Sequence, residues 1–239
     1  MSALLEISNI SKRFGGLQAL NDVNVTIQCG EILGLIGPNG AGKTTLFSTL
    51  VGLLKPSTGS VRLEGREMAG MKPHRIAAAG MVKTFQNVAL FLDSSVLDNV
   101  LTGGLMRHSV TEARTLARKC LAQVGLSDIA DKRAGDLSFP ERARVEVARA
   151  LCTEPRILLL DEAMAALNHI EMEELLTLLR RLRDDGLTLV IVEHHMKAIM
   201  SICDRLLVLN FGRQIAIGTP AEIARDPAVI EAYLGRSAA

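Results

Sequence analysis

Residues 37–45 read Gly-Pro-Asn-Gly-Ala-Gly-Lys-Thr-Thr, and their types and spacing are typical of a loop that binds a polyphosphate. Glycines let the backbone curl so that successive N–H groups point at one anion, and a following helix adds its partial positive charge. We expect Lys43 to reach the β- and γ-phosphates and the Thr44 hydroxyl to bind Mg²⁺. The residues expected around the phosphates are Gly37, Pro38, Asn39, Gly40, Ala41, Gly42, Lys43, Thr44 and Thr45.

Two adjacent carboxylates follow an apolar run farther along the chain. Residues 157–160 read Ile-Leu-Leu-Leu, and Asp161 and Glu162 come next. Because open α/β sheets place ligands at the carboxyl ends of their strands, we expect both acids beside the phosphates. Asp161 is suited to hold Mg²⁺ through water, and Glu162 is suited to polarise the attacking water as a general base. The alternative is an ordinary strand end with solvated acids, which the nearby phosphate loop disfavours.

The elements that must position these residues are visible in the hydrophobic pattern. The runs 32–36, 157–160 and 187–192 are nearly all apolar, which predicts central strands of a parallel sheet buried on both faces. Helical periodicity alternates with them, for example over 170–183. This alternation of strands and helices predicts an α/β sandwich.

Two other regions differ from this core. Segments 5–7, 23–27 and 60–64 alternate apolar and polar residues, as half-exposed antiparallel strands do. Strand signals vanish between about 91 and 152, which predicts an inserted helical subdomain. The helices expected there cover 96–106, 110–124 and 141–152. The predicted domains are 1–90 (antiparallel strands plus phosphate loop), 91–152 (helical subdomain) and 153–239 (the rest of the core and the C-terminal helices).

Composition narrows the class of protein. The chain has 239 residues, 48% hydrophobic and 22% charged, so a sizeable core is expected and disorder is not. A net charge of +1 gives no indication of nucleic-acid binding. We find no apolar run of about 18 residues and no signal peptide at the N-terminus. The four cysteines fit neither a zinc site nor a redox pair, and each is expected to be a small buried hydrophobe in a reducing compartment: Cys29, Cys120, Cys152 and Cys203.

Nearly the whole chain resembles the nucleotide-binding subunit of ATP-binding cassette (ABC) transporters. The resemblance implies a RecA-like P-loop NTPase core with a mixed sheet, an antiparallel β subdomain and an inserted helical subdomain. It also implies ATP and Mg²⁺ as cofactors and a head-to-tail pair of cassettes. It assigns Gln86 to the Q-loop, which senses the metal and the water, and His194 to the switch that touches the γ-phosphate. Phe14 matches the aromatic residue that stacks on adenine, and residues 165–168 match the D-loop.

A narrower resemblance is to bacterial branched-chain amino-acid uptake ATPases, a group with relatives that import amides, urea or other small organic acids. It is carried by residues 13–17, 84–87, 193–194, 218–223 and 229–235. It implies integral-membrane permease subunits, a second ATPase subunit that is identical or different, and an extracytoplasmic solute-binding protein. It places the chain peripherally on the cytoplasmic face of the bacterial inner membrane. The solute is left open, because other subunits recognise it.

The chain departs from the family at the signature segment. The usual Leu-Ser-Gly-Gly-Gln is replaced by Leu-Ser-Phe-Pro-Glu at 137–141. Ser138, whose hydroxyl in the family contacts the partner's γ-phosphate, forms a capping-box pattern with Glu141, so the helix start is intact. Pro140 has no N–H to donate, and Glu141 places a negative charge near a phosphate. We therefore expect an asymmetric assembly in which this segment completes a weaker site; the alternative is a branch of the family that tolerates the change.

Two further residues depart from the family pattern. Ala163 replaces a frequent proline, with little expected effect, and His195 stands where an acid is usual. Residues 87–99, with Leu90-Phe91-Leu92 at their centre, are candidates either for the permease contact or for core packing. Other readings are a soluble ABC protein of cluster assembly or translation, and a nucleotide-gated binding module that hydrolyses slowly. A GTPase is disfavoured, since no Asn-Lys-x-Asp motif is present.

Overall fold

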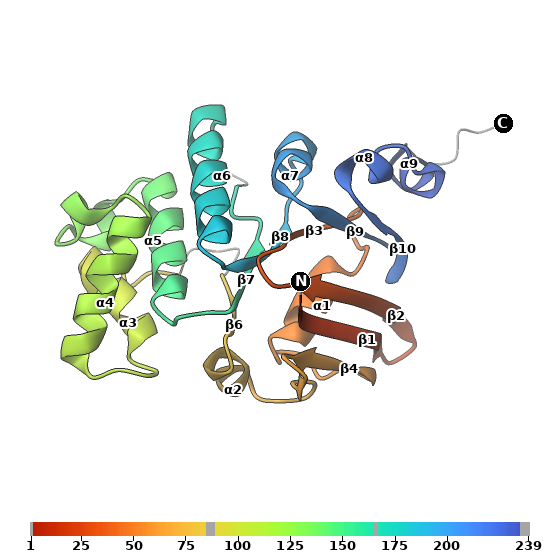
Figure 1. Cartoon of the computed structure of the whole chain (residues 1–239), viewed down its shortest axis with the longest axis horizontal. Helices are drawn as coiled ribbons and strands as arrows, with labels where there is room; N and C mark the ends of the chain where they lie inside the picture. The colour runs from red at the N-terminus through yellow and green to blue at the C-terminus, as the bar shows by residue number, and fades with distance from the viewer. Residues whose placement is uncertain (1, 85–88, 165–166, 235–239) are drawn as a thin grey trace.

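Two β-sheets and the helices around them make up the architecture seen in a computed structural model, which describes residues 2–84, 89–164 and 167–234 (Figure 1). The larger sheet has the strand order β10-β9-β3-β8-β7-β6. All its neighbouring pairs are parallel except β9 and β10, which form an antiparallel pair. Its strands are β3 (Ile32–Ile36), β6 (Met81–Lys83), β7 (Ile157–Asp161), β8 (Thr188–Val192), β9 (Arg205–Asn210) and β10 (Arg213–Gly218).

The centre of this sheet is buried on both faces. Every residue of β3, β7 and β8 is buried. Side chains alternate between two apolar cores, so that Leu158 and Leu160 face one and Ile157 and Leu159 face the other. The first core is completed by helices and the second by the antiparallel sheet. The predicted parallel strands with continuous apolar sequence are confirmed, because both faces of each strand need apolar cover.

The smaller sheet is antiparallel, with the order β2-β1-β4-β5, and confirms the strands predicted from alternating sequence. Its strands are β1 (Ala3–Phe14), β2 (Leu17–Gln28), β4 (Thr58–Leu63) and β5 (Arg66–Glu67). Helix α1 (Lys43–Leu50) buries Leu46, Phe47 and Leu50 in the same core. The short helix α2 (Pro73–Ala78) precedes β6. The phosphate loop therefore lies where the two sheets share one core.

Three helices gather at one side of the molecule, on the left of Figure 1. They are α3 (Val96–Gly104), α4 (Val110–Gln123) and α5 (Phe139–Leu151), and two short 3₁₀ turns, η1 (Ser127–Ile129) and η2 (Ala134–Asp136), connect α4 to α5. α3 ends two residues before the predicted boundary, because the Gly104 carbonyl accepts the N–H groups of Arg107 and His108 in a turn. α5 begins two residues before its predicted start, because Ser138 caps it.

The remaining helices cover the other face of the large sheet and the C-terminal end. They are α6 (His169–Asp184), α7 (Met196–Ile202), α8 (Pro220–Ile223) and α9 (Pro227–Leu234). Thr219 caps α8 and forms a capping box with Glu222. Three cysteines are buried as expected, but Cys29 is exposed, because it lies in the tight turn between β2 and β3.

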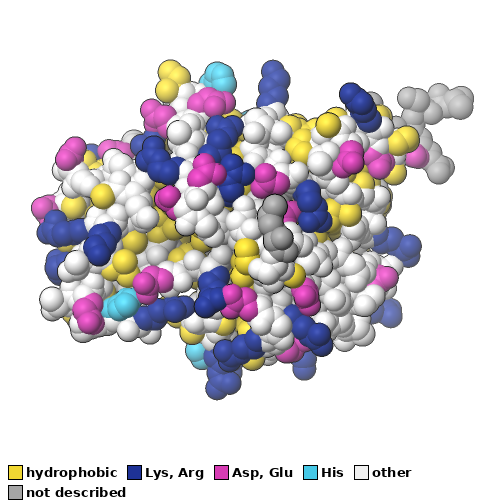
Figure 2. Space-filling view, viewed as in Figure 1, with side chains coloured by type: hydrophobic (Ala, Val, Ile, Leu, Met, Phe, Trp, Pro, Cys, Tyr) yellow, Lys and Arg dark blue, Asp and Glu magenta, His cyan; other side chains and the backbone are white. Residues whose placement is uncertain are grey.

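The surface carries both signs of charge, in keeping with the small net charge. On the face seen in Figure 2, Lys, Arg, Asp and Glu side chains are interspersed, and apolar side chains gather in a hollow beside the α3–α5 helices. Within the described ranges, no helix combines the length and the apolar character that a membrane crossing requires.

Candidate active site

The phosphate loop joins the buried end of β3 to the first turn of α1. Gly42 is the N-cap of α1 with φ +104°, and no side chain caps the helix. Gly37 and Gly40 also have positive φ angles of +151° and +78°. An uncapped helix start leaves backbone N–H groups free for an external acceptor, and the helix dipole favours that acceptor being an anion. The loop therefore has the backbone conformation of a phosphate cradle.

Lys43 lies across this cradle with its ammonium largely withdrawn from water. Its side chain donates to the carbonyl oxygens of Gly37 at 2.6 Å and Pro38 at 3.2 Å. Burial lowers the pKa of Lys43, and the negative charges of Glu162 and Asp161 oppose that shift. Because the charges of both acids act on Lys43, the loop and the two carboxylates form one electrostatic site, as the sequence predicted.

Asp161 ends β7 and is buried, with its side chain 4% exposed. Its Oδ2 lies 2.8 Å from Nζ of Lys83, a lysine that is itself 10% exposed and ends the neighbouring strand β6. The pair is held in place by the parallel pairing of β6 with β7. Sequence reasoning missed Lys83, because strand pairing between residues so far apart in sequence is not visible in a local pattern.

Glu162 is the first residue after β7 and has a left-handed backbone conformation, with φ +53°. Its N–H donates to the Val192 carbonyl of β8 at 2.9 Å. Its Oε1 lies 2.9 Å from Nε2 of His194, which follows β8. Since a residue other than glycine rarely adopts this conformation, the backbone is fixed here by its neighbours. The structure thus brings together an acid and a histidine that the sequence predicted separately.

Glu193 is a buried carboxylate just behind this pair, at 2% exposure. It accepts the Met164 N–H at 2.6 Å and the His194 N–H at 3.3 Å. Burial raises its pKa, and these two N–H groups oppose the rise. His195 Nδ1 lies 3.9 Å from the same carboxylate. Glu193 therefore connects the segment after β7 to the segment after β8. The sequence feature that could have indicated this role is its position beside a histidine at the end of a strand.

Family comparisons identify the family of the chain. Residues 20–165 match the profile of the ABC transporter family. The chain belongs to the ABC transporter family. A second profile, of branched-chain amino acid ATP-binding cassette transporters, matches residues 213–239.

Curated relatives cover the cassette from end to end. The high-affinity branched-chain amino acid transport ATP-binding proteins BraF from Pseudomonas aeruginosa and LivG from Escherichia coli are each 41% identical over 98% of both chains. The lipopolysaccharide export system ATP-binding protein LptB from Acidithiobacillus ferridurans is 36% identical, again over 98% of both.

Solved structures agree on the fold. A nucleotide-free ATP-binding cassette of an ABC transporter superposes with a TM-score of 0.90 at 30% identity, over 98% of this chain and 100% of that one. A dimeric cassette bound to ADP and phosphate has a TM-score of 0.80 at 27% identity, over 91% and 99%. The cassette is accordingly an ATPase subunit of a kind that binds nucleotide, forms dimers and works with membrane permeases, and the predicted P-loop NTPase fold is confirmed.

Of the remaining predicted positions, Phe14 is among the described residues. Phe14 ends β1 and is 45% exposed, with the Lys12 ammonium 5.0 Å from its ring centroid. A half-exposed ring is open to stacking by a planar base. Gln86 of the Q-loop and the first two residues of the D-loop, 165–166, lie outside the described residues. Their assignments stay predictions.

The signature serine forms its hydrogen bonds within its own helix, α5, in this single cassette. Ser138 caps α5, and both its N–H and its Oγ donate to Oε2 of Glu141, at 2.6 and 2.7 Å. These hydrogen bonds, above all that from the hydroxyl, hold the pKa of Glu141 below its usual value. Lys132 Nζ lies 3.7 Å from the other carboxylate oxygen. The predicted capping box is confirmed, and it places a carboxylate on the hydroxyl that the family uses for phosphate.

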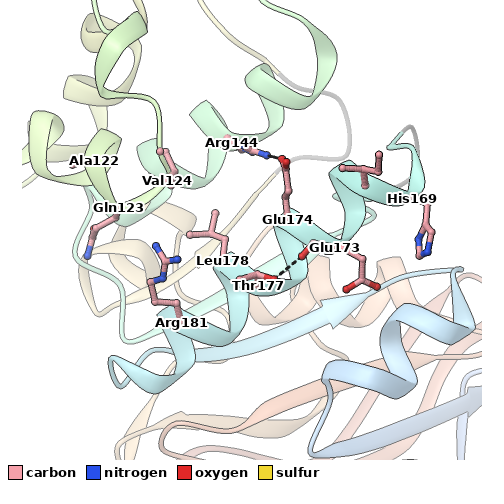
Figure 3. A pocket seen from close by; sticks show the side chains of 12 residues that line it. Ala122, Gln123, Val124, Arg144, His169, Glu173, Glu174, Thr177, Leu178 and Arg181 are labelled. Carbon is pink, nitrogen blue, oxygen red and sulfur yellow. Dashed lines mark hydrogen bonds and ion pairs between the residues drawn. The ribbon is translucent and has the colours of Figure 1, made fainter.

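The signature helix is also braced against the helix that follows the D-loop. Arg144 of α5 forms an ion pair with Glu174 of α6, and Figure 3 shows the two side chains meeting across a cavity of about 630 Å³. Arg181 and Gln123 also line this cavity. Neither the phosphate loop nor the carboxylates of the active site line this cavity, so it is separate from the nucleotide site.

Proposed function

We propose that the cassette is the ATP-hydrolysing subunit of an importer for branched-chain amino acids or related small organic solutes. The observation that carries the proposal is the Glu162–His194 pair at 2.9 Å, set beside the Lys43 loop. It occurs in a chain 41% identical, over 98% of its length, to two branched-chain amino acid transport ATP-binding proteins. The match of the C-terminal segment 213–239 to the same group supports the choice of solute class.

Magnesium fits the oxygen donors present. Thr44 presents a hydroxyl at the first turn of α1, and Asp161 presents a carboxylate at the end of β7. Among the described residues, no group of three or more His, Cys, Asp or Glu side chains could hold a metal unaided. Mg²⁺ commonly takes further oxygens from the phosphates of its substrate. When bound, Mg²⁺ neutralises charge that develops on the phosphates; Gln86 is its third proposed contact.

The cassette's own residues then divide the work of hydrolysis. Backbone N–H groups of residues 37–45, apart from Pro38, and the Lys43 ammonium hold the phosphates, and Phe14 stacks on adenine. Glu162 takes a proton from the attacking water, and its oxygen already lies in a defined position because His194 and the Val192 carbonyl restrain it. His194 presents its ring to the γ-phosphate. Ser138 of each cassette faces the nucleotide held by the partner.

We infer that this assembly lies on the cytoplasmic face of the bacterial inner membrane, bound to permease subunits and served by an extracytoplasmic solute-binding protein. A groove of about 520 Å³ supplies a docking surface for a permease helix. Its walls come from the core and from α3 and α5, and include Leu53, Ala77, Phe91 and Met106. Within the candidate segment 87–99, Leu90 packs against the core, whereas Phe91 is 59% exposed.

The docking surface can be tested directly. We expect Phe91→Glu to reduce co-purification of the cassette with its co-expressed permease subunits by at least about tenfold, because a charge replaces an apolar contact. Val110→Glu is the matched control: Val110 is 58% exposed at the start of α4, where an acid is compatible with the helix dipole. Equal retention of both variants would contradict the docking surface.

The solute class has its own test. Wild-type complexes in proteoliposomes, supplied with their solute-binding protein, should take up labelled branched-chain amino acids when ATP is present. Complexes that hydrolyse ATP but take up neither these amino acids nor related small organic solutes would contradict the solute class.

The signature substitution gives a second prediction. Glu141→Gln should raise ATP hydrolysis by the assembled transporter about twofold to fivefold, because it removes a negative charge facing the partner's phosphate while glutamine preserves the capping box. Glu112→Gln is the control, since Glu112 makes the same capping box with Ser109 in α4. Phosphate release is measured for both. An unchanged or lower rate in Glu141→Gln would favour the alternative that this branch tolerates the acid.

A further inference from the structure

A buried lysine forms an ion pair with Asp161, the carboxylate that we propose as a metal ligand. Nζ of Lys83 lies 2.8 Å from Oδ2 of Asp161, and the two side chains are 10% and 4% exposed. The ion pair is therefore screened little by solvent, unlike the exposed pairs on the surface of the cassette. Asp161 cannot offer both oxygens fully to a metal while this contact persists.

Charge balance explains why the lysine lies there. Asp161 and Glu162 are adjacent acids, and Lys43 feels both of their charges. Two acids beside one partly buried ammonium would leave net negative charge in a poorly solvated site, and such uncompensated charge is unfavourable. Lys83 supplies a second positive charge, which offsets the charge of this adjacent pair of acids. Glu193, whose pKa is raised by burial, is a further carboxylate close to Glu162.

A divalent cation changes that balance. Mg²⁺ near Asp161 brings two positive charges next to the Lys83 ammonium, and like charges at short range in a partly buried site repel strongly. Lys83 also lines the groove beside Thr84 and Phe91. Its long, flexible stem thus gives the ammonium an open space to move into without losing access to water.

We propose that Lys83 is a positioning residue that competes with Mg²⁺ for Asp161 and thereby sets the metal concentration at which the cassette holds nucleotide. This inference rests on the proposed metal role of Asp161. Loading of the metal displaces the ammonium from the carboxylate toward the groove. Because the groove is also the proposed docking surface, the position of Lys83 joins that surface to the metal site.

The test uses binding of a fluorescent ADP derivative to the purified cassette, so that no hydrolysis is involved. Mg²⁺ is titrated at fixed nucleotide, and the metal concentration at half-maximal binding is recorded. Lys83→Met should lower this midpoint about threefold to tenfold, since the competing charge is gone. Lys83→Arg keeps the charge and should stay within about twofold of wild type. Lys119→Met removes an exposed positive charge from α4 and should leave the midpoint unchanged.

Each outcome has a defined meaning. A Lys83→Met midpoint equal to or above that of wild type would overturn the competition, because a purely structural ion pair would not oppose the metal. Wild-type protein that binds the nucleotide without any dependence on Mg²⁺ would instead overturn the metal role of Asp161. Circular dichroism melting checks that each variant is folded. If Lys83→Met is unfolded, Lys83→Gln, which keeps a polar group at the site, takes its place, and the same shift of the Mg²⁺ midpoint is expected.

Discussion

Glu162→Gln is expected to lower ATP hydrolysis by at least about 100-fold while leaving nucleotide affinity within about threefold of wild type. A general base contributes roughly 10²–10⁴-fold to rate, and the amide cannot accept the proton of the water. The substitution should not disturb the fold, because the backbone N–H of residue 162 still donates to the Val192 carbonyl. An amide oxygen can also still accept from His194 Nε2, which lies 2.9 Å from Glu162 Oε1.

Two measurements separate chemistry from binding in this variant. Phosphate release by the assembled transporter reports the rate, and titration with a fluorescent ATP derivative reports affinity. Glu173→Gln, an exposed acid on α6, is the matched control for removal of one negative charge. If Glu162→Gln kept more than about a tenth of the wild-type rate, Glu162 would not be the base. If the wild-type rate were slow as well, the nucleotide-gated binding module would be the better description.

Much of the site was predictable because its residues follow one another in short motifs. Residues 37–45 carry their chemistry and their loop geometry together, and the apolar run before Asp161 indicates both a strand and its end. The capping box at Ser138 and Glu141 is likewise local, so it was visible in four residues. Such features depend on backbone conformation within a few residues, which the sequence specifies directly.

The contacts missed by the sequence all depend on strand pairing over long separations. Lys83 meets Asp161 only because β6 pairs with β7 in a register that sets Lys83 opposite Leu159. Glu193 binds the Met164 N–H only because β7 and β8 end at the same edge of the sheet. Two charged residues at strand ends could each have been solvated. Nothing in their local sequence indicates which strand lies next to them, so their partners appear only in three dimensions.

Gly37→Ala is expected to lower the free energy of unfolding by about 3 kcal/mol or more and to abolish nucleotide binding. A Cβ atom at this position would overlap the backbone carbonyl oxygen of Leu209 and approach Ala41 Cβ to 2.9 Å. Neither neighbour is the end of a flexible side chain: Leu209 belongs to β9 and is fully buried, and Ala41 is buried in the loop. Overpacking a rigid site costs about 1–3 kcal/mol, and a φ of +151° adds strain for alanine.

Gly40→Ala provides the comparison that isolates this effect, since both glycines lie in the same loop and both have positive φ. A Cβ at Gly40 would meet nothing within 4 Å. Its φ of +78° should cost about 1 kcal/mol, because the left-handed penalty for alanine is partly offset by the loss of chain entropy in the unfolded state. Urea unfolding without nucleotide measures both variants. Equal destabilisation of the two variants would mean that backbone conformation alone requires glycine. If Gly37→Ala is less stable than Gly40→Ala by about 2 kcal/mol, glycine is required at position 37 because β9 approaches it closely.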